Sequence, residues 1–226
     1  MSTPGGRAPA VLFDVDGTLV DSNYLHVHAW VRAFYDMGVH TAAWRIHRSI
    51  GMDGSTLVDA LSGDADEQTE QQLKDLHSRY YRELAPLLRV LPDGRAVLEE
   101  VASRGLQAVL ATSAPDDELS LLRETLDREG LVSEVTSSAD VETAKPNPDI
   151  VNVALARAGV EASRAVFVGD SVWDAVAAVR AGVPCIGVLS GGFSRDELCA
   201  AGAVVVYDDV RQLADNIDSS PISALM

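Results

Sequence analysis

Two aspartates, Asp14 and Asp16, directly follow the short apolar run 10–13. Side chains two positions apart in a strand point the same way, so both carboxylates would face the mouth of a sheet, where a divalent cation could bind. Phosphoryl transfer needs a nucleophile and a group that protonates the departing oxygen. Asp14 could attack and touch the metal, while Asp16 could act as acid and then as base. The alternative is a strand end with two turn-forming aspartates.

Small and hydroxylated residues near two expected strand ends could hold an anion. Gly17 permits a sharp turn, and its amide with the Thr18 hydroxyl could contact a phosphate. Thr112 and Ser113 follow the run 107–111 and precede an expected helix. Thr112 could donate to a phosphate oxygen or only neighbour a helix cap, and Ser113 with Asp116 resembles a capping box.

A lysine and two further aspartates complete the set of chemical candidates. Lys145, in a proline-rich loop, could neutralise a phosphate and keep Asp14 ionised, although a single loop lysine is usually a solvated surface group. Asp170 ends the run 165–168 and could join Asp14 around Mg²⁺, which prefers oxygen ligands. Asp174 could cap its helix with Ser171, and we expect it also to orient a metal-bound water.

Apolar runs alternate with helical patterns along most of the chain. The pattern predicts strands at 10–13, 107–111, 134–137, 165–168, 184–189 and 203–207, with helices near 93–103, 115–128, 148–158, 172–181 and 194–200. This rhythm is typical of an α/β fold with a doubly wound parallel sheet. Residues 22–88 lack a strand pattern and show helical periodicity. We therefore expect a core of residues 1–21 and 89–226 and an inserted helical cap of residues 22–88 above the ligand edge of the sheet.

Composition limits the classes of function. The 226 residues are 47% hydrophobic, enough for one sizeable core and a smaller unit. A formal net charge of −16 argues against nucleic-acid and anionic membrane partners. We expect no signal peptide or membrane span, a frayed tail over residues 1–9, and two buried free thiols, Cys185 and Cys199, in a reducing cytoplasm. We see no exposed heptad or long edge strand that would indicate an oligomeric state.

The order of these motifs resembles that of the haloacid dehalogenase superfamily. The family has four motifs in this order. Its Asp-X-Asp-Gly-Thr matches Asp14 and Asp16, and its Thr or Ser matches Thr112. Its Lys matches Lys145, and its Gly-Asp with a further acidic residue matches Asp170 and Asp174. The resemblance covers about residues 10–210. It implies a Rossmann-like core with a helical cap after the first strand and an aspartyl-phosphate intermediate. It also implies Mg²⁺ bound by Asp14, the Asp16 carbonyl and Asp170.

Within this superfamily, Asp16 favours phosphate-ester chemistry, because dehalogenases and phosphonate-cleaving members lack that second aspartate. The resemblance implies a hydrolase similar to phosphoglycolate phosphatase that acts on a small phosphorylated metabolite. A sugar phosphate mutase similar to β-phosphoglucomutase is the alternative, and a non-catalytic phospho-ligand module is a third. The loop 51–54 lacks the basic residue with which the mutase grips a second phosphate, which favours the phosphatase.

The expected cap supplies candidates for contact with the non-phosphate end of the substrate. His26 lies where the mutase has a histidine near its acid/base, and Arg48 is a further candidate. The full set is His26, His28, Trp30, Arg45, His47 and Arg48. Trp173 and Phe193 are expected to pack, and the acidic residues Asp64, Asp66, Glu67 and Glu70 to form the solvated start of a helix.

Overall fold

The computed structural model describes residues 7–63, 65–141, 143 and 145–226. Among these residues, strands β1, β4, β5, β6, β7 and β8 form one parallel sheet in the order β5-β4-β1-β6-β7-β8. The strands are β1 (Ala10–Phe13), β4 (Gln107–Ala111), β5 (Val132–Thr136), β6 (Ala165–Gly169), β7 (Cys185–Val188) and β8 (Ala203–Tyr207). This confirms the predicted doubly wound α/β core, with β5 beginning two residues earlier than expected.

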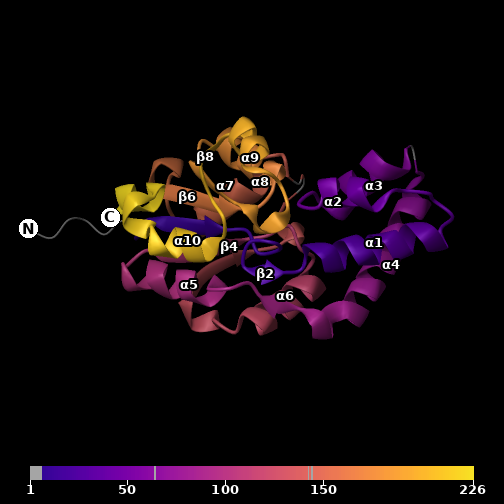
Figure 1. Ribbon diagram of the computed structural model, residues 1–226, viewed down its shortest axis with the longest axis horizontal. Helices are drawn as coiled ribbons and strands as arrows, with labels where there is room; N and C mark the ends of the chain where they lie inside the picture. Colours follow the sequence, from indigo (N-terminus) through magenta and orange to yellow (C-terminus); the bar gives the residue numbers. More distant parts are fainter. Residues whose placement is uncertain (1–6, 64, 142, 144) are drawn as a thin grey trace, which may run out of the picture.

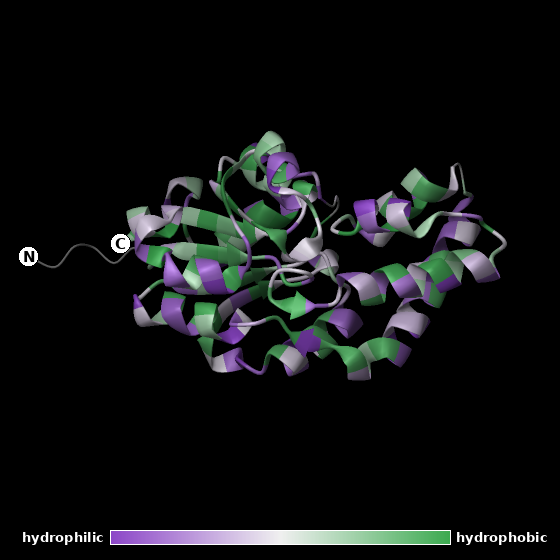
Figure 2. Ribbon diagram, in the orientation of Figure 1, coloured by the Kyte–Doolittle hydropathy of each residue, from purple (hydrophilic) through white to green (hydrophobic). Residues whose placement is uncertain are grey.

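Helices cover both faces of the sheet, as Figure 1 shows. They are α5 (Gly94–Ser103), α6 (Asp116–Leu126), α7 (Asp149–Ala158), α8 (Val172–Arg180), α9 (Arg195–Ala201) and α10 (Val210–Asp215). Val11 and Phe13 pack on the side of α5, α6 and α10, whereas Ala10 and Leu12 pack with α7, α8 and α9. Alternate residues of β1 therefore feed two separate cores, which is why its sequence is apolar without interruption (Figure 2).

Residues 23–84 form a helical segment at one end of the molecule (Figure 1). Its helices are α1 (Asn23–Asp36), α2 (Ala43–Ser49), α3 (Gly54–Ser62) and α4 (Glu67–Leu84). Asp66 begins α4 by accepting from the backbone N–H of Thr69, which agrees with the expected acidic helix start; Asp64 lies outside the described residues. Trp30 and Phe34 of α1 are buried, and α1 packs lengthwise on α4.

Two short strands join this helical segment to the sheet. Strand β2 (Val20–Asp21) precedes α1, and β3 (Arg89–Val90) follows α4; the two pair antiparallel. The chain therefore leaves the sheet domain and returns to it at the same place, beyond the carboxyl end of β1. The sequence did not predict this pair, because two-residue strands are too short to show a periodic pattern.

Three smaller expectations can be compared with the structure. Cys185 is buried as expected, but Cys199 is exposed on the outer side of α9, so the prediction of two buried thiols is wrong for that residue. Of the expected frayed tail, residues 1–6 lie outside the described residues, while Arg7 contacts the carbonyl of Arg157 at 2.8 Å. Over the part of the chain that the structure describes, no helix is long and apolar enough to cross a bilayer.

Candidate active site

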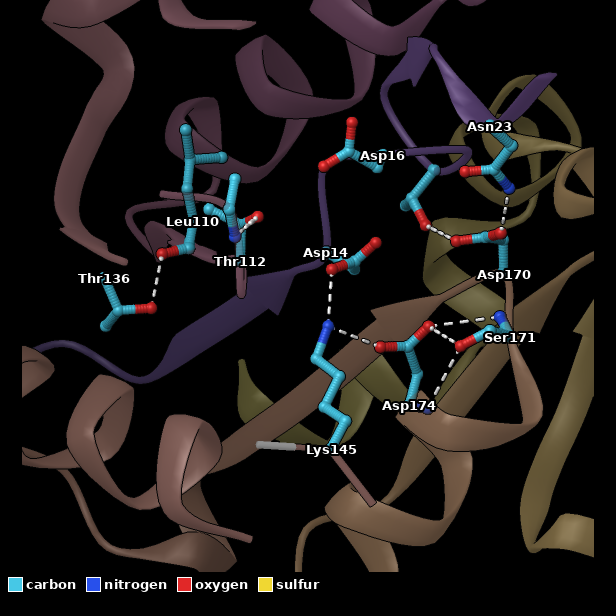
Figure 3. Close-up of polar contacts among 12 residues, drawn as sticks. Asp14, Asp16, Asn23, Leu110, Thr112, Thr136, Lys145, Asp170, Ser171 and Asp174 are labelled. Atoms are coloured by element: carbon cyan, nitrogen blue, oxygen red, sulfur yellow. Dashed lines mark hydrogen bonds and ion pairs between the residues drawn. The ribbon is translucent and has the colours of Figure 1, made fainter. Parts of the chain in front are cut away.

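The register of the central strands brings distant residues to one edge. Phe13 lies opposite Leu110 of β4 and Val168 of β6. Each strand is followed by a polar residue: Asp14 comes after β1, Thr112 after β4 and Asp170 after β6. These residues therefore emerge side by side at the carboxyl end of the sheet. Parallel open sheets bind ligands at this edge. Figure 3 shows Asp14 between Thr112 and Asp170, with Lys145 and Asp16 on opposite sides of it.

Lys145 joins two of the carboxylates. Its Nζ lies 2.5 Å from Oδ1 of Asp14 and 2.7 Å from Oδ1 of Asp174, and its side chain is 1% exposed. The other oxygen of Asp174 accepts from the backbone N–H of Ser171 at 3.1 Å and from its hydroxyl at 2.6 Å. The capping box expected at the start of α8 is therefore present. The expectation that Lys145 is more often a solvated surface group does not hold here.

Asp170 is held by two neutral donors from the segment after β1. The hydroxyl of Thr18 donates to Oδ1 and the amide of Asn23 to Oδ2, each at 2.9 Å. Gly17 has a φ of +75°, and a Cβ there would lie 2.2 Å from the Asn23 amide and 2.5 Å from Asp170. Only glycine fits this position, because the backbone conformation and the close approach both exclude a side chain.

Gly17 and Thr18 thus have different partners from those expected. The Gly17 amide donates to the carbonyl of Val20 at 2.8 Å, and the Thr18 hydroxyl is fully buried against Asp170. The structure therefore contradicts the expectation that these two groups contact a phosphate. Their contacts instead shape the turn after β1 and orient the Asp170 carboxylate.

The cluster around Asp14 carries more negative than positive charge. Burial raises the pKa of Asp14 well above its usual value; Lys145 lowers it, and the carboxylates of Asp174 and Asp170 raise it further. Burial and Asp174 likewise raise the pKa of Asp170 to about 7. For Lys145, burial lowers the pKa, but Asp14 and Asp174 outweigh burial and raise it overall. Three buried carboxylates share one ammonium group.

This excess of buried carboxylate oxygen fits a divalent cation. One oxygen from each of Asp14, Asp170 and Asp174 lies within 4.8 Å of the others. Because oxygen-rich, negatively charged sites are those that Mg²⁺ and similar hard cations occupy, these residues could hold a metal ion. A cation would supply the positive charge that Lys145 alone does not.

Asp16 lines the same cavity but has its own partners. Its Oδ1 accepts from the Ser22 hydroxyl at 2.5 Å and lies 3.2 Å from Nε2 of His26. Burial raises the pKa of Asp16, but His26 and the two hydrogen bonds outweigh burial and lower it overall. Burial lowers the pKa of His26, whereas Asp16 and then Glu118 raise it, and the net change is a rise. The His26 ring stacks on Tyr81 at 4.0 Å between centroids.

The residues after β4 form another wall of the cavity. The Thr112 hydroxyl accepts from the backbone N–H of Ala114 at 3.0 Å. The buried hydroxyl of Ser113 has no hydrogen-bond partner among the described residues, although it lines the cavity. Helix α6 begins at Asp116 with Pro115 as its N-cap, so the capping box expected between Ser113 and Asp116 does not form. The Ser113 hydroxyl is therefore available to a ligand.

The cavity has a volume of about 930 Å³ and lies between the sheet edge and the helical segment. Of the side chains proposed from the sequence, Asp14, Asp16, His26, Trp30, Thr112, Ser113, Lys145 and Asp170 line it. Two cations that the sequence analysis missed, Lys74 and Arg82 of α4, line it too. Lys74 pairs with Glu70 at 2.9 Å, and Arg82 lies 3.8 Å from Asp117.

Arg48 was expected to contact the substrate, but the structure places it elsewhere. Its guanidinium pairs with Glu197 at 2.5 Å and lies over the ring of Phe193, and Arg48 is not among the described residues that line the cavity. His47 likewise contacts the carbonyl of Gly191 at 2.9 Å. Helix α2 therefore turns these basic residues toward the core helices and the loop after β7.

His28 and Arg45 are exposed. The packing expected of the aromatic candidates is found: Phe193 is buried, and half-buried Trp173 donates from Nε1 to the carbonyl of Arg48 at 3.1 Å. Of the cap candidates, His26 and Trp30 are those that the structure places in the cavity wall.

Asn23, His77 and Glu118 were missed by sequence reasoning. Asn23 follows Ser22 at a helix start, where it is indistinguishable from a capping residue. His77 and Glu118 lie within helices as polar residues of ordinary spacing. Only their burial against the site, with 6% and 3% of their surfaces exposed, distinguishes them.

The comparisons with known proteins agree with this geometry. The family model described as haloacid dehalogenase-like hydrolase matches residues 11–188. The chain belongs to this family. The prediction made from the motif order is thereby confirmed.

Individual relatives and structures give the same result. A phosphoglycolate phosphatase from Rhodospirillum rubrum is 31% identical over 219 residues, which cover 91% of this chain and 89% of the relative. A hydrolase structure from Pseudomonas syringae superimposes with a TM-score of 0.90 at 32% identity, covering 93% of this chain and 98% of that one. A β-phosphoglucomutase structure from Clostridium difficile shares the fold, with a TM-score of 0.81 at 19% identity and coverage of 91% and 93%.

Proposed function

We propose that this hydrolase is a Mg²⁺-dependent phosphatase that cleaves a small phosphomonoester, phosphoglycolate or a close relative, through an aspartyl-phosphate. The observation that carries the proposal is the position of Asp14, buried beside Lys145 and Asp170 on a cavity that Asp16 also lines. The phosphoglycolate phosphatases among its relatives support this reaction and substrate class.

The first chemical step is assigned to Asp14 and Asp16. An oxygen of Asp14 attacks phosphorus, the ester P–O bond breaks, and Asp16 gives its proton to the departing alkoxide. In the second step Asp16 takes a proton from water as that water attacks phosphorus. The bond between phosphorus and the Asp14 oxygen then breaks, which releases inorganic phosphate and restores both carboxyl groups.

Lys145 and the residues after β4 hold the phosphate in this scheme. The ammonium group of Lys145 fixes one oxygen of Asp14 at 2.5 Å and neutralises nearby anionic charge. The Ser113 hydroxyl, which has no partner among the described residues, and the adjacent Thr112 provide donors at the opposite wall. Mg²⁺, held by Asp14, Asp170 and the Asp16 carbonyl with Asp174 behind them, would polarise the phosphoryl group when bound.

We assign residues 22–88 the role of a cap over this site. Trp30, Met52 and Leu57 from the helical segment give the cavity apolar wall, opposite the charged sheet edge. Such a wall excludes water while the ester reacts. The antiparallel β2 and β3 form the two-stranded connection through which this cap joins the core, residues 1–21 and 89–226.

The charges of the cap favour hydrolysis over a mutase reaction. A bisphosphorylated sugar requires a free cation for its second phosphate. Among the residues lining the cap side of the cavity, Lys74 is paired with Glu70 and Arg82 lies near Asp117. In the loop 51–54, Asp53 is engaged in capping α3. A phosphomonoester with a single phosphate group has no second phosphate to bind.

The deciding experiment is a panel of phosphomonoesters with Mg²⁺, assayed for inorganic phosphate. We expect release from phosphoglycolate and from a generic aryl phosphate, and none from Asp14→Asn or Asp16→Asn. Asp59→Asn, an exposed carboxylate on α3, is the matched control and should keep wild-type activity. Turnover retained by Asp14→Asn would exclude this nucleophile.

Two outcomes would identify the other candidate functions. Conversion of β-glucose 1-phosphate to glucose 6-phosphate without net phosphate release would indicate a mutase. Failure of the wild-type protein to release phosphate from any ester would indicate a non-catalytic phospho-ligand module.

A further inference from the structure

A continuous chain of polar contacts runs from Asp16 into the cavity wall. Nε2 of His26 lies 3.2 Å from Asp16, and Nδ1 of His26 lies 3.1 Å from Nε2 of His77. Nδ1 of His77 in turn lies 3.5 Å from Oε1 of Glu118. Each imidazole thus uses both of its nitrogens, and each nitrogen faces a different partner.

Aromatic rings hold both imidazoles in place. His77 stacks on Trp30 with centroids 4.2 Å apart, and His26 stacks on Tyr81 at 4.0 Å. His26, His77 and Glu118 are 8%, 6% and 3% exposed. Because the rings are fixed by packing, the remaining freedom of the chain lies in which nitrogen carries each proton.

The ionised carboxylate of Glu118 decides that choice. A neutral imidazole has one N–H and one acceptor nitrogen. Because a carboxylate can only accept, its position 3.5 Å from Nδ1 of His77 favours the tautomer with the proton on Nδ1, which makes Nε2 an acceptor. His26 then donates from Nδ1 to His77, and its Nε2 is left to face Oδ1 of Asp16; a protonated Nε2 donates to that carboxylate, the state that the raised pKa of His26 favours. A buried partner that fixes the tautomer of a catalytic imidazole is a known way to orient it.

We propose that Glu118 and His77 are positioning residues for Asp16: through His26 they hold in place the imidazole nitrogen that contacts the acid/base carboxyl. The proposal rests on the proposed function, in which Asp16 protonates the leaving group. Glu118 belongs to α6 of the core, whereas His26 and His77 belong to α1 and α4. The arrangement at Asp16 therefore depends on the helical segment lying against α6.

The same three side chains could also be considered as a metal site, because one ligand atom of each lies within 4.8 Å of the others. The contacts argue against this alternative. His77 directs Nε2 to His26 and Nδ1 to Glu118, so a cation at either nitrogen would have to displace the partner that this nitrogen already faces. The chain of polar contacts uses every one of these atoms.

The test combines ring ¹⁵N spectroscopy with kinetics on the full chain at mildly alkaline pH. In the wild-type protein we expect His77 to carry its proton on Nδ1. Glu118→Leu should leave His77 as a mixture of tautomers, and its kcat on an aryl phosphate should fall about tenfold, part of the 10²–10⁴-fold that acid/base catalysis contributes. KM should change little, since neither residue is assigned a substrate contact.

Glu118→Gln should restore most of both signals, because its amide oxygen can still accept from Nδ1 of His77. Asp117→Asn is the matched control: it weakens the adjacent contact of α6 with Ser78 of α4, at 3.0 Å, and should leave the His77 tautomer as in the wild type. His77→Phe, which keeps the ring stacking, should lose as much kcat as the double variant with Glu118→Leu, because the effects act through one chain.

The proposal is overturned if Glu118→Leu leaves the His77 tautomer unchanged, or if the tautomer changes and kcat does not. It is also overturned if Asp117→Asn alters the tautomer as much as Glu118→Leu does. A wild-type protein that releases no phosphate would refute the proposed function. The ring spectra would still show whether Glu118 fixes His77, so the two failures can be told apart.

Discussion

The substitution Gly17→Ala tests how the turn after β1 supports the metal-binding edge. The added methyl group would lie 2.2 Å from Nδ2 of Asn23 and 2.5 Å from Oδ2 of Asp170. Asn23 must then move, and its 2.9 Å hydrogen bond to Asp170 is lost. A left-handed alanine costs about 1–2 kcal/mol, and a hydrogen bond to a charged group is worth about 1.5–3 kcal/mol. We expect a loss of roughly 2.5–5 kcal/mol in the free energy of unfolding.

The matched control is Gly105→Ala. Gly105 has a φ of +73°, close to the +75° of Gly17, but a Cβ there meets no atom within 4 Å among the described residues. It should therefore show only the backbone cost, about 1–2 kcal/mol. The difference between the two variants, about 1.5–3 kcal/mol, measures the contact with Asn23 and Asp170.

Urea denaturation monitored by circular dichroism gives both free energies, and a Mg²⁺ titration of phosphatase activity gives the functional effect. Loss of the amide that orients Asp170 should raise the Mg²⁺ concentration for half-maximal activity about tenfold in Gly17→Ala, as with other partners of metal ligands. Gly105→Ala should match the wild type. Equal destabilisation of the two variants, or an unchanged Mg²⁺ requirement in Gly17→Ala, would refute the reasoning.

Three further predictions concern the charges of the site. Lys145→Met leaves the buried carboxylates of Asp14 and Asp174 without their ammonium partner, so urea denaturation should show a loss of about 3–5 kcal/mol in the free energy of unfolding. The control Lys74→Met breaks a partly exposed pair and should cost under about 1 kcal/mol. Mg²⁺ at a hundred times its Kd should stabilise the wild-type protein by about 3 kcal/mol in thermal denaturation. The same stabilisation in Asp170→Asn would argue against Asp170 as a ligand of the metal. Burial raises the pKa of Glu118 from 4.5 to about 7, so the folded state binds more protons than the unfolded state between these values and stability falls as pH rises through them. Glu118→Gln has no carboxyl group and should not show this loss of stability. The free energy of unfolding of the variant minus that of the wild type should therefore rise by roughly 3 kcal/mol from below pH 4.5 to above pH 7. A difference that does not change with pH would contradict the raised pKa of Glu118.

Much of the sheet edge could be predicted from the sequence because the relevant signals are local. Apolar runs flanked by polar turn residues marked β1, β4 and β6, and Asp14, Thr112 and Asp170 follow those runs directly. In a parallel sheet, strand ends gather at one edge whatever the length of the connections. The position of a residue just after its strand was therefore enough to place it near the others.

The partners of these residues required the tertiary structure. Gly17 and Thr18 were expected to contact phosphate, but the turn directs the Thr18 hydroxyl to Asp170. Arg48 was expected in the cavity, yet α2 directs it toward Glu197. The periodicity of a helix shows which residues share a face, but it does not show which neighbour that face will meet.

The sequence by itself determined the nucleophile candidate, the acid/base candidate and the polar residues that follow the strands at one edge of the sheet. These depend on local pattern and on the geometry of parallel sheets. The tertiary structure alone decided that His26, His77 and Glu118 form a chain to Asp16. These contacts join residues that are 10, 51 and 41 positions apart: Asp16 after β1, His26 on α1, His77 on α4 and Glu118 on α6. Contacts between elements depend on how those elements pack, and the sequence of a single helix does not specify which other helix it packs against.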